Sequence, residues 1–394
     1  MIRTLDDLDA QGAAVGVRVD INSPIGADGT LDDDSRLRAH RETLAELADR
    51  GARVVVLAHQ GRPGGDDFTT LESHAARLGD LLPASVEYVD ATFSAAARER
   101  VEGLDDGTVL VLENTRFYSE EVLQFPPEDA AETHLVRGLA PVLDAYVNDA
   151  FAAAHRAQPS IVGFPVRLSG YAGRVMEREL DALGNIGETP TPRVYCLGGA
   201  KVDDSIEVAA SVLDSGLADA VLTSGVVGNS FLHVSGVDLG AESTRVVNDR
   251  AGDRLAQAER LLSEYGDRLH LPVDVAVERD GERVEVAVAD LPVEEPAMDI
   301  GSATVDAYAD VLEDAGTAIL NGPAGVFEDD RFAAGTDGLF AAATAAEYTI
   351  VGGGDTAAAI RHLDLEGFDH VSTGGGAALA MLTGESLPAV EALR

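Results

Sequence analysis

The chain has 394 residues, a formal net charge of −40 at pH 7 and 45% apolar residues. A globular protein of about two or three domains fits this length and composition. The acidity argues against nucleic-acid binding, and no apolar run approaches the roughly 18 residues of a membrane span. The single Cys196 excludes an internal disulfide, and the acidic N-terminus lacks a signal-peptide pattern, so we expect a cytoplasmic protein.

Repulsion among the acidic side chains predicts a dependence on salt. The chain carries about one excess negative charge per ten residues, which destabilises a compact state in dilute buffer. Concentrated salt screens surface charges beyond a few ångströms. We therefore expect a halophilic protein from a high-salt cytoplasm.

Strand-like runs of β-branched and apolar residues alternate with helical stretches. The first series of predicted strands comprises residues 15–21, 53–59, 86–90, 108–114 and 145–151. The second comprises residues 193–199, 219–225, 270–277, 317–323, 348–355 and 370–376. Helices are predicted over residues 36–50, 71–82, 204–214 and 252–265. This alternation indicates an α/β fold with parallel sheets that helices cover on both faces, whereas residues 282–290 alternate in polarity and predict an exposed hairpin strand.

The boundary between two halves is predicted at about residues 165–192. The stretch GYAGRVMERELDALGN is typical of one helix that ends near Gly184. The segment ETPTPR follows it as a stiff linker. We therefore expect two α/β lobes that are joined by a helix.

Basic side chains follow the predicted strands of the first half. Ligands of α/β sheets bind beyond the carboxyl ends of the strands. These ends carry, or are closely followed by, Arg18, Arg36, His59, Arg62, Arg116, His155 and Arg156. Guanidinium groups suit the bidentate capture of phosphate and carboxylate. We interpret this set as an anion site; the alternative is that each arginine pairs with a neighbouring acid.

Glycine dominates the strand ends of the second half. Glycine lets backbone amides approach a phosphate closely, and a helix N-terminus adds a favourable dipole. In VGGGDTAAAI the glycine loop opens a predicted helix, where Asp355 could hold Mg²⁺ and Thr356 could donate to a phosphate. Two alternatives remain open: Asp355 as a plain N-cap, and residues 352–357 as a dinucleotide fingerprint of the form G-x-G-x-x-A.

Nine short motifs occur in a fixed order along the chain. They are RVDIN (18–22), AHQGRP (58–63), ENTRF (113–117), NDAFAAAHRA (148–157), LGGAKV (197–202), LPVD (271–274), NGPAGVFE (321–328), GGGDT (352–356) and VSTGGGA (371–377). Together they resemble the phosphoglycerate kinase family over nearly the whole chain. The resemblance implies reversible, Mg²⁺-dependent phosphoryl transfer between 1,3-bisphosphoglycerate and ADP, which gives 3-phosphoglycerate and ATP.

The same resemblance implies a domain organisation. Two Rossmann-like lobes would face a central cleft in a monomeric, hinge-bending protein. The implied parts are a 3-phosphoglycerate-binding lobe at 1–168, an interdomain helix and linker at 169–190, a nucleotide-binding lobe at 191–377 and a tail at 378–394 that returns to the N-terminal lobe.

Roles for individual residues follow from the resemblance as well. The residues implied to bind phosphoglycerate are Asp20, Asn22, Arg36, His59, Gln60, Gly61, Arg62, Arg116 and Arg156. Those implied to bind the nucleotide are Lys201, Gly301, Asn321, Glu328, Gly352, Gly353, Gly354, Asp355 and Thr356, with Mg²⁺ on Asp355. The residues implied to meet the charge of the transferring phosphoryl group are Arg36, Lys201, Gly374 and Gly375.

Two positions depart from the family's pattern. Ser205 stands where many members have a second lysine, so Lys201, the only lysine of the chain, is left alone to meet the nucleotide phosphates. Gln158 stands where many members have a histidine, which thins the basic patch. Both features resemble the archaeal branch of the family. Two competing hypotheses are a Rossmann dehydrogenase and a non-enzymatic two-lobed binding protein for a phosphorylated solute.

Overall fold

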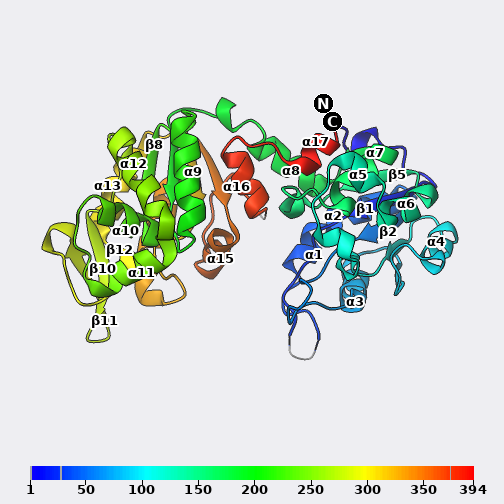
Figure 1. Cartoon of the computed structure of the whole chain (residues 1–394), viewed down its shortest axis with the longest axis horizontal. Helices are drawn as coiled ribbons and strands as arrows, with labels where there is room; N and C mark the ends of the chain where they lie inside the picture. Colours follow the sequence, from blue (N-terminus) through cyan, green and yellow to red (C-terminus); the bar gives the residue numbers. More distant parts are fainter. Residues whose placement is uncertain (1, 27–28, 373) are drawn as a thin grey trace. The chain divides into compact units, whose positions relative to one another are not determined.

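Two compact units make up the computed structural model, which describes residues 2–26, 29–372 and 374–394 (Figure 1). Unit 1 holds the chain up to Asp181 together with Ser386–Arg394, and unit 2 holds Ala182–Glu385. The chain passes from unit 1 to unit 2 within helix α8 (Arg174–Leu183). Its last residues, which include α17 (Pro388–Ala392), belong to unit 1 again. No helix of the described residues is long and apolar enough to cross a membrane.

A six-stranded parallel sheet forms the centre of unit 1, in the order β3-β4-β2-β1-β5-β6. From β1 to β6 the strands are Ala14–Arg18, Arg53–Leu57, Val86–Tyr88, Val109–Val111, Ala145–Asn148 and Ser169–Ala172. From α1 to α7 the helices are Ser35–Ala39, Arg41–Asp49, Glu72–Leu81, Ala95–Glu102, Pro127–Ala131, His134–Leu139 and Phe164–Arg167. The central β1 is buried along its whole length, as expected for a strand that helices cover on both faces.

The register of this sheet brings three loops together. Arg18, the last residue of β1, pairs with Leu57 of β2 on one side and Asn148 of β5 on the other. Parallel strands that end level with one another begin their following loops at the same edge. The polar residues that follow β1, β2 and β5 therefore start side by side.

Unit 2 contains a second six-stranded parallel sheet, in the order β15-β14-β13-β7-β8-β9, and a three-stranded antiparallel sheet, β11-β10-β12. From β7 to β15 the strands are Arg193–Leu197, Ala220–Thr223, Leu269–His270, Asp274–Arg279, Glu282–Ala287, Asp299–Ile300, Thr317–Asn321, Tyr348–Gly352 and His370–Val371. From α9 to α16 the helices are Val202–Asp214, Gly225–Val234, Ala241–Ala251, Leu255–Tyr265, Ser302–Glu313, Ala334–Ala343, Gly354–His362 and Gly376–Leu382. Asn321 at the end of β13 pairs with Leu197 and Gly352, so the glycine loops after β7, β13 and β14 share one edge.

The structure confirms the mixed α/β class, the two parallel sheets and the alternating hairpin strand, but it differs from the predicted elements at three places. Residues 169–172, predicted as the start of a long helix, form strand β6 because they pair with β5. The predicted strand 270–277 divides between two sheets at Pro272, which has no N–H to donate to a ladder. The predicted helix 36–50 is broken at His40 into α1 and α2.

The thermal midpoint of unfolding is expected to rise by about 10 °C or more between dilute buffer and molar KCl. The 69 acidic residues outnumber the 29 basic residues, so basic side chains cannot neutralise the net charge of −40. Screening by salt removes this repulsion from the folded state. Calorimetry in a KCl series measures the effect, and sucrose at equal osmolality, which does not screen charge, is the control. A midpoint that does not depend on KCl would contradict the prediction.

Candidate active site

The end of β1 places a charged side chain inside the core of unit 1. Arg18 is fully buried, and its Nε donates to Ser160 Oγ at 2.8 Å. Its Nη2 lies 2.9 Å from His59 Nδ1. A guanidinium can only donate, so Nδ1 of His59 accepts and the imidazole proton sits on Nε2. Burial, together with the charge of Arg18, holds the pKa of His59 well below its usual range, so the ring is a neutral Nε2–H donor.

Asp20 and Arg36 form a pair beside this histidine. Arg36 Nη1 donates to Asp20 Oδ2 at 2.7 Å, from the first turn of α1. Burial alone would raise the pKa of Asp20, but the charges of Arg36 and Arg18 outweigh this effect and bring it down to about 2. The carboxylate is therefore ionised at neutral pH and fixes one end of Arg36.

Three further arginines, Arg62, Arg116 and Arg156, form no ion pair with an acid in the part of the chain that the structure describes. We call Arg18, Arg36, His59, Arg62, Arg116 and Arg156 the basic cluster. Among the described residues, Arg36 is the only arginine of the cluster that forms an ion pair. Burial and repulsion from Arg156, Arg18 and Arg62 lower the pKa of Arg116 to about 10. Burial and the same kind of repulsion also lower the pKa of Arg156. An unneutralised cluster of this kind favours a ligand with several negative charges.

The amide side chains of the predicted site hold its loops together. Asn22 Oδ1 accepts from the Gly61 backbone N–H at 2.7 Å. Gln60 is fully buried and forms two hydrogen bonds with the backbone of Ser23. Its Oε1 accepts from the Ser23 N–H, and its Nε2 donates to the Ser23 C=O. Gly61 has φ of +65°, and a Cβ there would lie 2.6 Å from the backbone of Asp67. These three residues shape the loop around the cluster.

Glycine loops and one ion pair form a pocket in unit 2. Lys201 Nζ lies 2.8 Å from Asp355 Oδ2, and both side chains are largely exposed. Thr356 is buried, and its Oγ1 accepts from the Gly322 N–H at 2.7 Å. The residues that line this pocket are Gly198, Gly199, Ala200, Lys201, Asp204, Ser205, Asn321, Gly322, Pro323, Gly353, Gly354, Asp355, Thr356, Gly375, Gly376 and Leu379. Small residues and backbone amides around one cation suit a chain of phosphates.

A more apolar pocket adjoins the first one at Asp355. Its lining residues include Val226, Met298, Ile300, Val326, Phe327 and Glu328. An apolar pocket beside a glycine-lined one fits the base of a nucleotide. The sequence singled out Glu328 and pointed to MDIGS (298–302) through Gly301, whereas Met298, Asp299 and Ile300 of that segment line the pocket.

Three predicted glycines lie differently from the expectation. Gly352 ends β14 and lines neither pocket. Gly301 does not line either pocket; it precedes α13, where a Cβ would lie 2.2 Å from Asp274 Oδ2. The Gly374 N–H donates to Ser372 Oγ at 3.0 Å, so this amide is already engaged within its own loop. Gly375 does line the phosphate pocket.

Two further residues that the sequence singled out are buried. The side chain of Gln158 is buried, and burial raises the pKa of the Cys196 thiol to about 12.

These features describe a two-unit α/β protein with a basic cluster in one unit and a glycine-lined pocket in the other, an arrangement that suits a phosphotransferase. A model of the phosphoglycerate kinase family matches residues 5–385. The chain belongs to the phosphoglycerate kinase family. This membership removes the dehydrogenase and the solute-binding protein as competing hypotheses.

Phosphoglycerate kinases of known organisms are similar to this chain over their whole lengths. The phosphoglycerate kinase of Natronomonas pharaonis is 67% identical, and that of Halobacterium salinarum 65% identical, each with 100% of both chains covered. Both organisms are halophilic archaea, in line with the expected halophilic character. The crystal structure of phosphoglycerate kinase from Pyrococcus horikoshii OT3 is similar with a TM-score of 0.92 and 41% identity, covering 100% of this chain and 98% of that one.

Proposed function

We propose that the basic cluster of unit 1 binds 3-phosphoglycerate and that the glycine-lined pocket of unit 2 binds the nucleotide. As a phosphoglycerate kinase, the chain transfers a phosphoryl group reversibly between 1,3-bisphosphoglycerate and ADP, a step of glycolysis. The observation that carries the assignment of unit 1 is the set of arginines that, among the described residues, form no ion pair and repel one another. Phosphoglycerate, which bears a carboxylate and a phosphate, supplies the missing negative charges.

Each group of the cluster has a task in this proposal. Arg62, Arg116 and Arg156 bind the 3-phosphate and the carboxylate with their guanidinium forks. His59 donates its Nε2–H, because Arg18 occupies its other ring nitrogen. Asp20, ionised at neutral pH, accepts from the hydroxyl of the glycerate and orients Arg36 toward the transferring group.

Lys201 is proposed to exchange partners when the nucleotide binds. In this structure its ammonium pairs with Asp355. Phosphate oxygens at the glycine loops offer more negative charge than one exposed carboxylate, so the ammonium turns to them and meets the charge of the transferring group. The carboxylate and phosphate oxygens that react are already nucleophilic, so no general base is needed.

Asp355 fits a Mg²⁺ ion that nucleotide phosphates help to hold. It is a single carboxylate at the junction of the two pockets. Among the residues that the structure describes, no group of three or more His, Cys, Asp or Glu side chains offers a site made of protein alone. Mg²⁺ is usually held by one or two carboxylates plus phosphates, and when bound it neutralises phosphate charge. Asp355, once released by Lys201, would be its protein ligand.

The remaining expectations belong to the same proposal. Each substrate site is built within one unit of one chain, so we propose that a monomer suffices. We propose a cytoplasmic enzyme that does not bind nucleic acid, in keeping with the net charge of −40. Transfer without hydrolysis requires the substrates to meet out of water. Because the chain passes between its units within α8, we propose α8 as the hinge.

Replacing Arg62 with alanine is expected to weaken 3-phosphoglycerate binding about tenfold or more and to leave ADP binding unchanged. Arg62 is exposed at the loop after β2, where it adds its charge to Arg116 and Arg156. Titration calorimetry with each ligand separately, in molar KCl, measures both constants. Arg137→Ala, an exposed arginine of α6 in the same unit, is the matched control. Weakened ADP binding in R62A would contradict the assignment of ligands to units.

A further inference from the structure

A buried chain of hydrogen bonds runs behind Asp20. His40 Nε2 lies 3.0 Å from the Asp20 backbone nitrogen and 3.1 Å from the Asp20 carbonyl oxygen, and His40 Nδ1 lies 2.6 Å from Asp149 Oδ2. The other carboxylate oxygen of Asp149 accepts from the Val175 N–H at 2.8 Å, in the first turn of α8. His40 is 3% exposed and Asp149 is 0% exposed, so water does not compete for these bonds. This series of hydrogen bonds links the loop that carries Asp20 to the start of α8.

The direction of these bonds fixes the tautomer of His40. The Asp149 carboxylate accepts from His40 Nδ1, so this ring nitrogen carries a proton. With the proton on Nδ1, Nε2 is able to accept from the Asp20 N–H. Asp149 therefore favours the tautomer whose Nε2 accepts from the Asp20 backbone.

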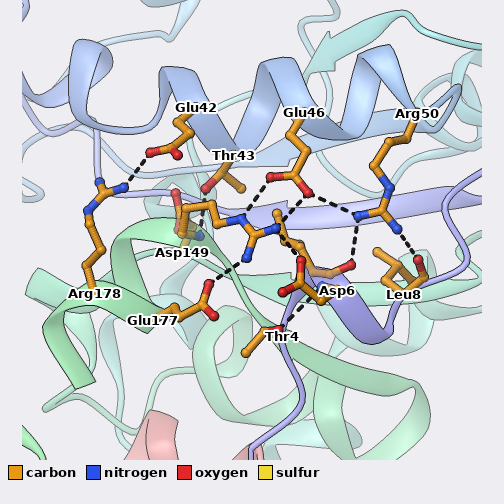
Figure 2. A network of polar contacts seen from close by, with 12 residues as sticks. Thr4, Asp6, Leu8, Glu42, Thr43, Glu46, Arg50, Asp149, Glu177 and Arg178 are labelled. Atoms are coloured by element: carbon orange, nitrogen blue, oxygen red, sulfur yellow. Dashed lines mark hydrogen bonds and ion pairs between the residues drawn. The ribbon is translucent and has the colours of Figure 1, made fainter. Parts of the chain in front are cut away.

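The start of α8 is itself firmly held (Figure 2). Arg174 donates to Glu46 of α2 at 2.8 Å, to Asp6 at 2.6 Å and to Glu177 at 2.8 Å. Its backbone N–H donates to Thr43 Oγ1 at 2.9 Å. A Cβ on the preceding Gly173 would lie 2.2 Å from Asp149 Oδ1, so only glycine lets the carboxylate come this close. Asp149 is thus held against a fixed helix end.

We propose that His40 is a positioning residue for the phosphoglycerate site, with Asp149 as the group that orients it. The inference rests on the proposed roles of Asp20 and Arg36 in substrate binding. The Arg36 side chain is 42% exposed and its ion-pair partner is Asp20, so a shift of the Asp20 backbone moves the guanidinium as well. A displacement of about 1 Å in a binding or catalytic group can cost up to about 100-fold in rate. His40 and Asp149 touch no substrate in this account and act only through Asp20.

Five variants test this inference by titration with 3-phosphoglycerate and, separately, with ADP in molar KCl. His40→Leu removes both hydrogen bonds and is expected to raise the Kd for 3-phosphoglycerate about tenfold, with the Kd for ADP unchanged. His40→Gln keeps one acceptor and one donor, and is expected to restore affinity to within about threefold of the parent. Thr43→Val, which removes one hydrogen bond between α2 and α8 without touching Asp20, is the matched control and is expected to lower the thermal midpoint only.

Asp149→Asn allows the tautomer of His40 to be measured, and a general loss of folding stability would not change this tautomer. An amide N–H₂ facing His40 favours the opposite ring tautomer, whose Nε2–H no longer accepts from the Asp20 N–H and donates to the Asp20 C=O instead. Nitrogen-15 chemical shifts of the His40 ring are expected to report this exchange, together with a rise of about tenfold in the Kd for 3-phosphoglycerate. This variant decides the question if His40→Leu does not fold. An unchanged tautomer with unchanged affinity would overturn the inference.

The remaining outcomes separate this inference from the proposed function. Asp20→Asn tests the substrate site directly. If D20N weakens 3-phosphoglycerate binding while H40L binds it like the parent, His40 is not a positioning residue. Equal losses in H40L and T43V would also overturn the inference, because the effect would be general loosening. Parent-like affinity in D20N would overturn the proposed site and the inference together.

Discussion

Replacing Lys201 with alanine is expected to lower kcat by about 10²- to 10³-fold while both KM values stay within about threefold. The side chain is 68% exposed in this structure, and its ion-pair partner is Asp355 rather than a residue of the core. Its removal therefore costs little folding stability. Ser205, buried in the same pocket, brings no second ammonium, so no neighbouring lysine substitutes for the lost charge.

Two variants sharpen this test. Lys201→Arg keeps the charge on a bulkier, planar group and is expected to recover only part of the loss. Arg254→Ala removes a cation from a comparable exposed ion pair with Glu207 in the same unit, and is expected to leave kcat unchanged. If K201A raised the KM for ATP as much as it lowered kcat, Lys201 would bind the ground state and not the transferring group.

Replacing Arg36 with alanine is expected to lower kcat by about 10³-fold, the scale found for arginines that stabilise phosphoryl transfer. Asp20 holds Arg36 at 2.7 Å, and the rest of its fork remains available to a ligand. A guanidinium that meets charge developing in the transition state affects kcat more than KM. Steady-state rates in both directions, in molar KCl, measure the effect.

Arg38 supplies the control for this substitution. It lies on the same helix, α1, but pairs with Asp34 at 2.7 Å and has no link to the basic cluster. Arg38→Ala is therefore expected to retain the parent kcat. Equal losses in R36A and R38A would show that α1 is disturbed as a whole, and would contradict a direct role for Arg36.

The sequence predicted the two parallel sheets because their strands are short apolar runs with polar or glycine-rich ends. It did not predict β6, because residues 169–172 lack a strand pattern and become a strand only by pairing with β5. The separation of β9 from β10 likewise depends on tertiary pairing on either side of Pro272. The local strand propensity of a segment does not determine long-range pairing of this kind.

The candidate site was predictable where a motif places a residue at a strand end. Register then brings Asp20, His59 and Asn148 to one edge, as expected for parallel strands. Contacts between distant segments were not predictable: His40 with Asp149, Lys201 with Asp355, and Gly301 with Asp274. The Gly374 amide was expected to face the phosphates, but Ser372 two residues earlier takes it up. Glycine content alone does not predict that a nearby side chain, such as that of Ser372, accepts a hydrogen bond from a backbone N–H.

The central claim is that two sites in one chain hold the two substrates of one phosphoryl transfer. Its most direct measurement is ATP consumption in molar KCl with Mg²⁺, followed through reductive formation of glyceraldehyde 3-phosphate from the acyl phosphate product. The account predicts turnover that requires 3-phosphoglycerate and ATP together. No turnover under these conditions, or ATP hydrolysis that does not depend on 3-phosphoglycerate, would contradict it.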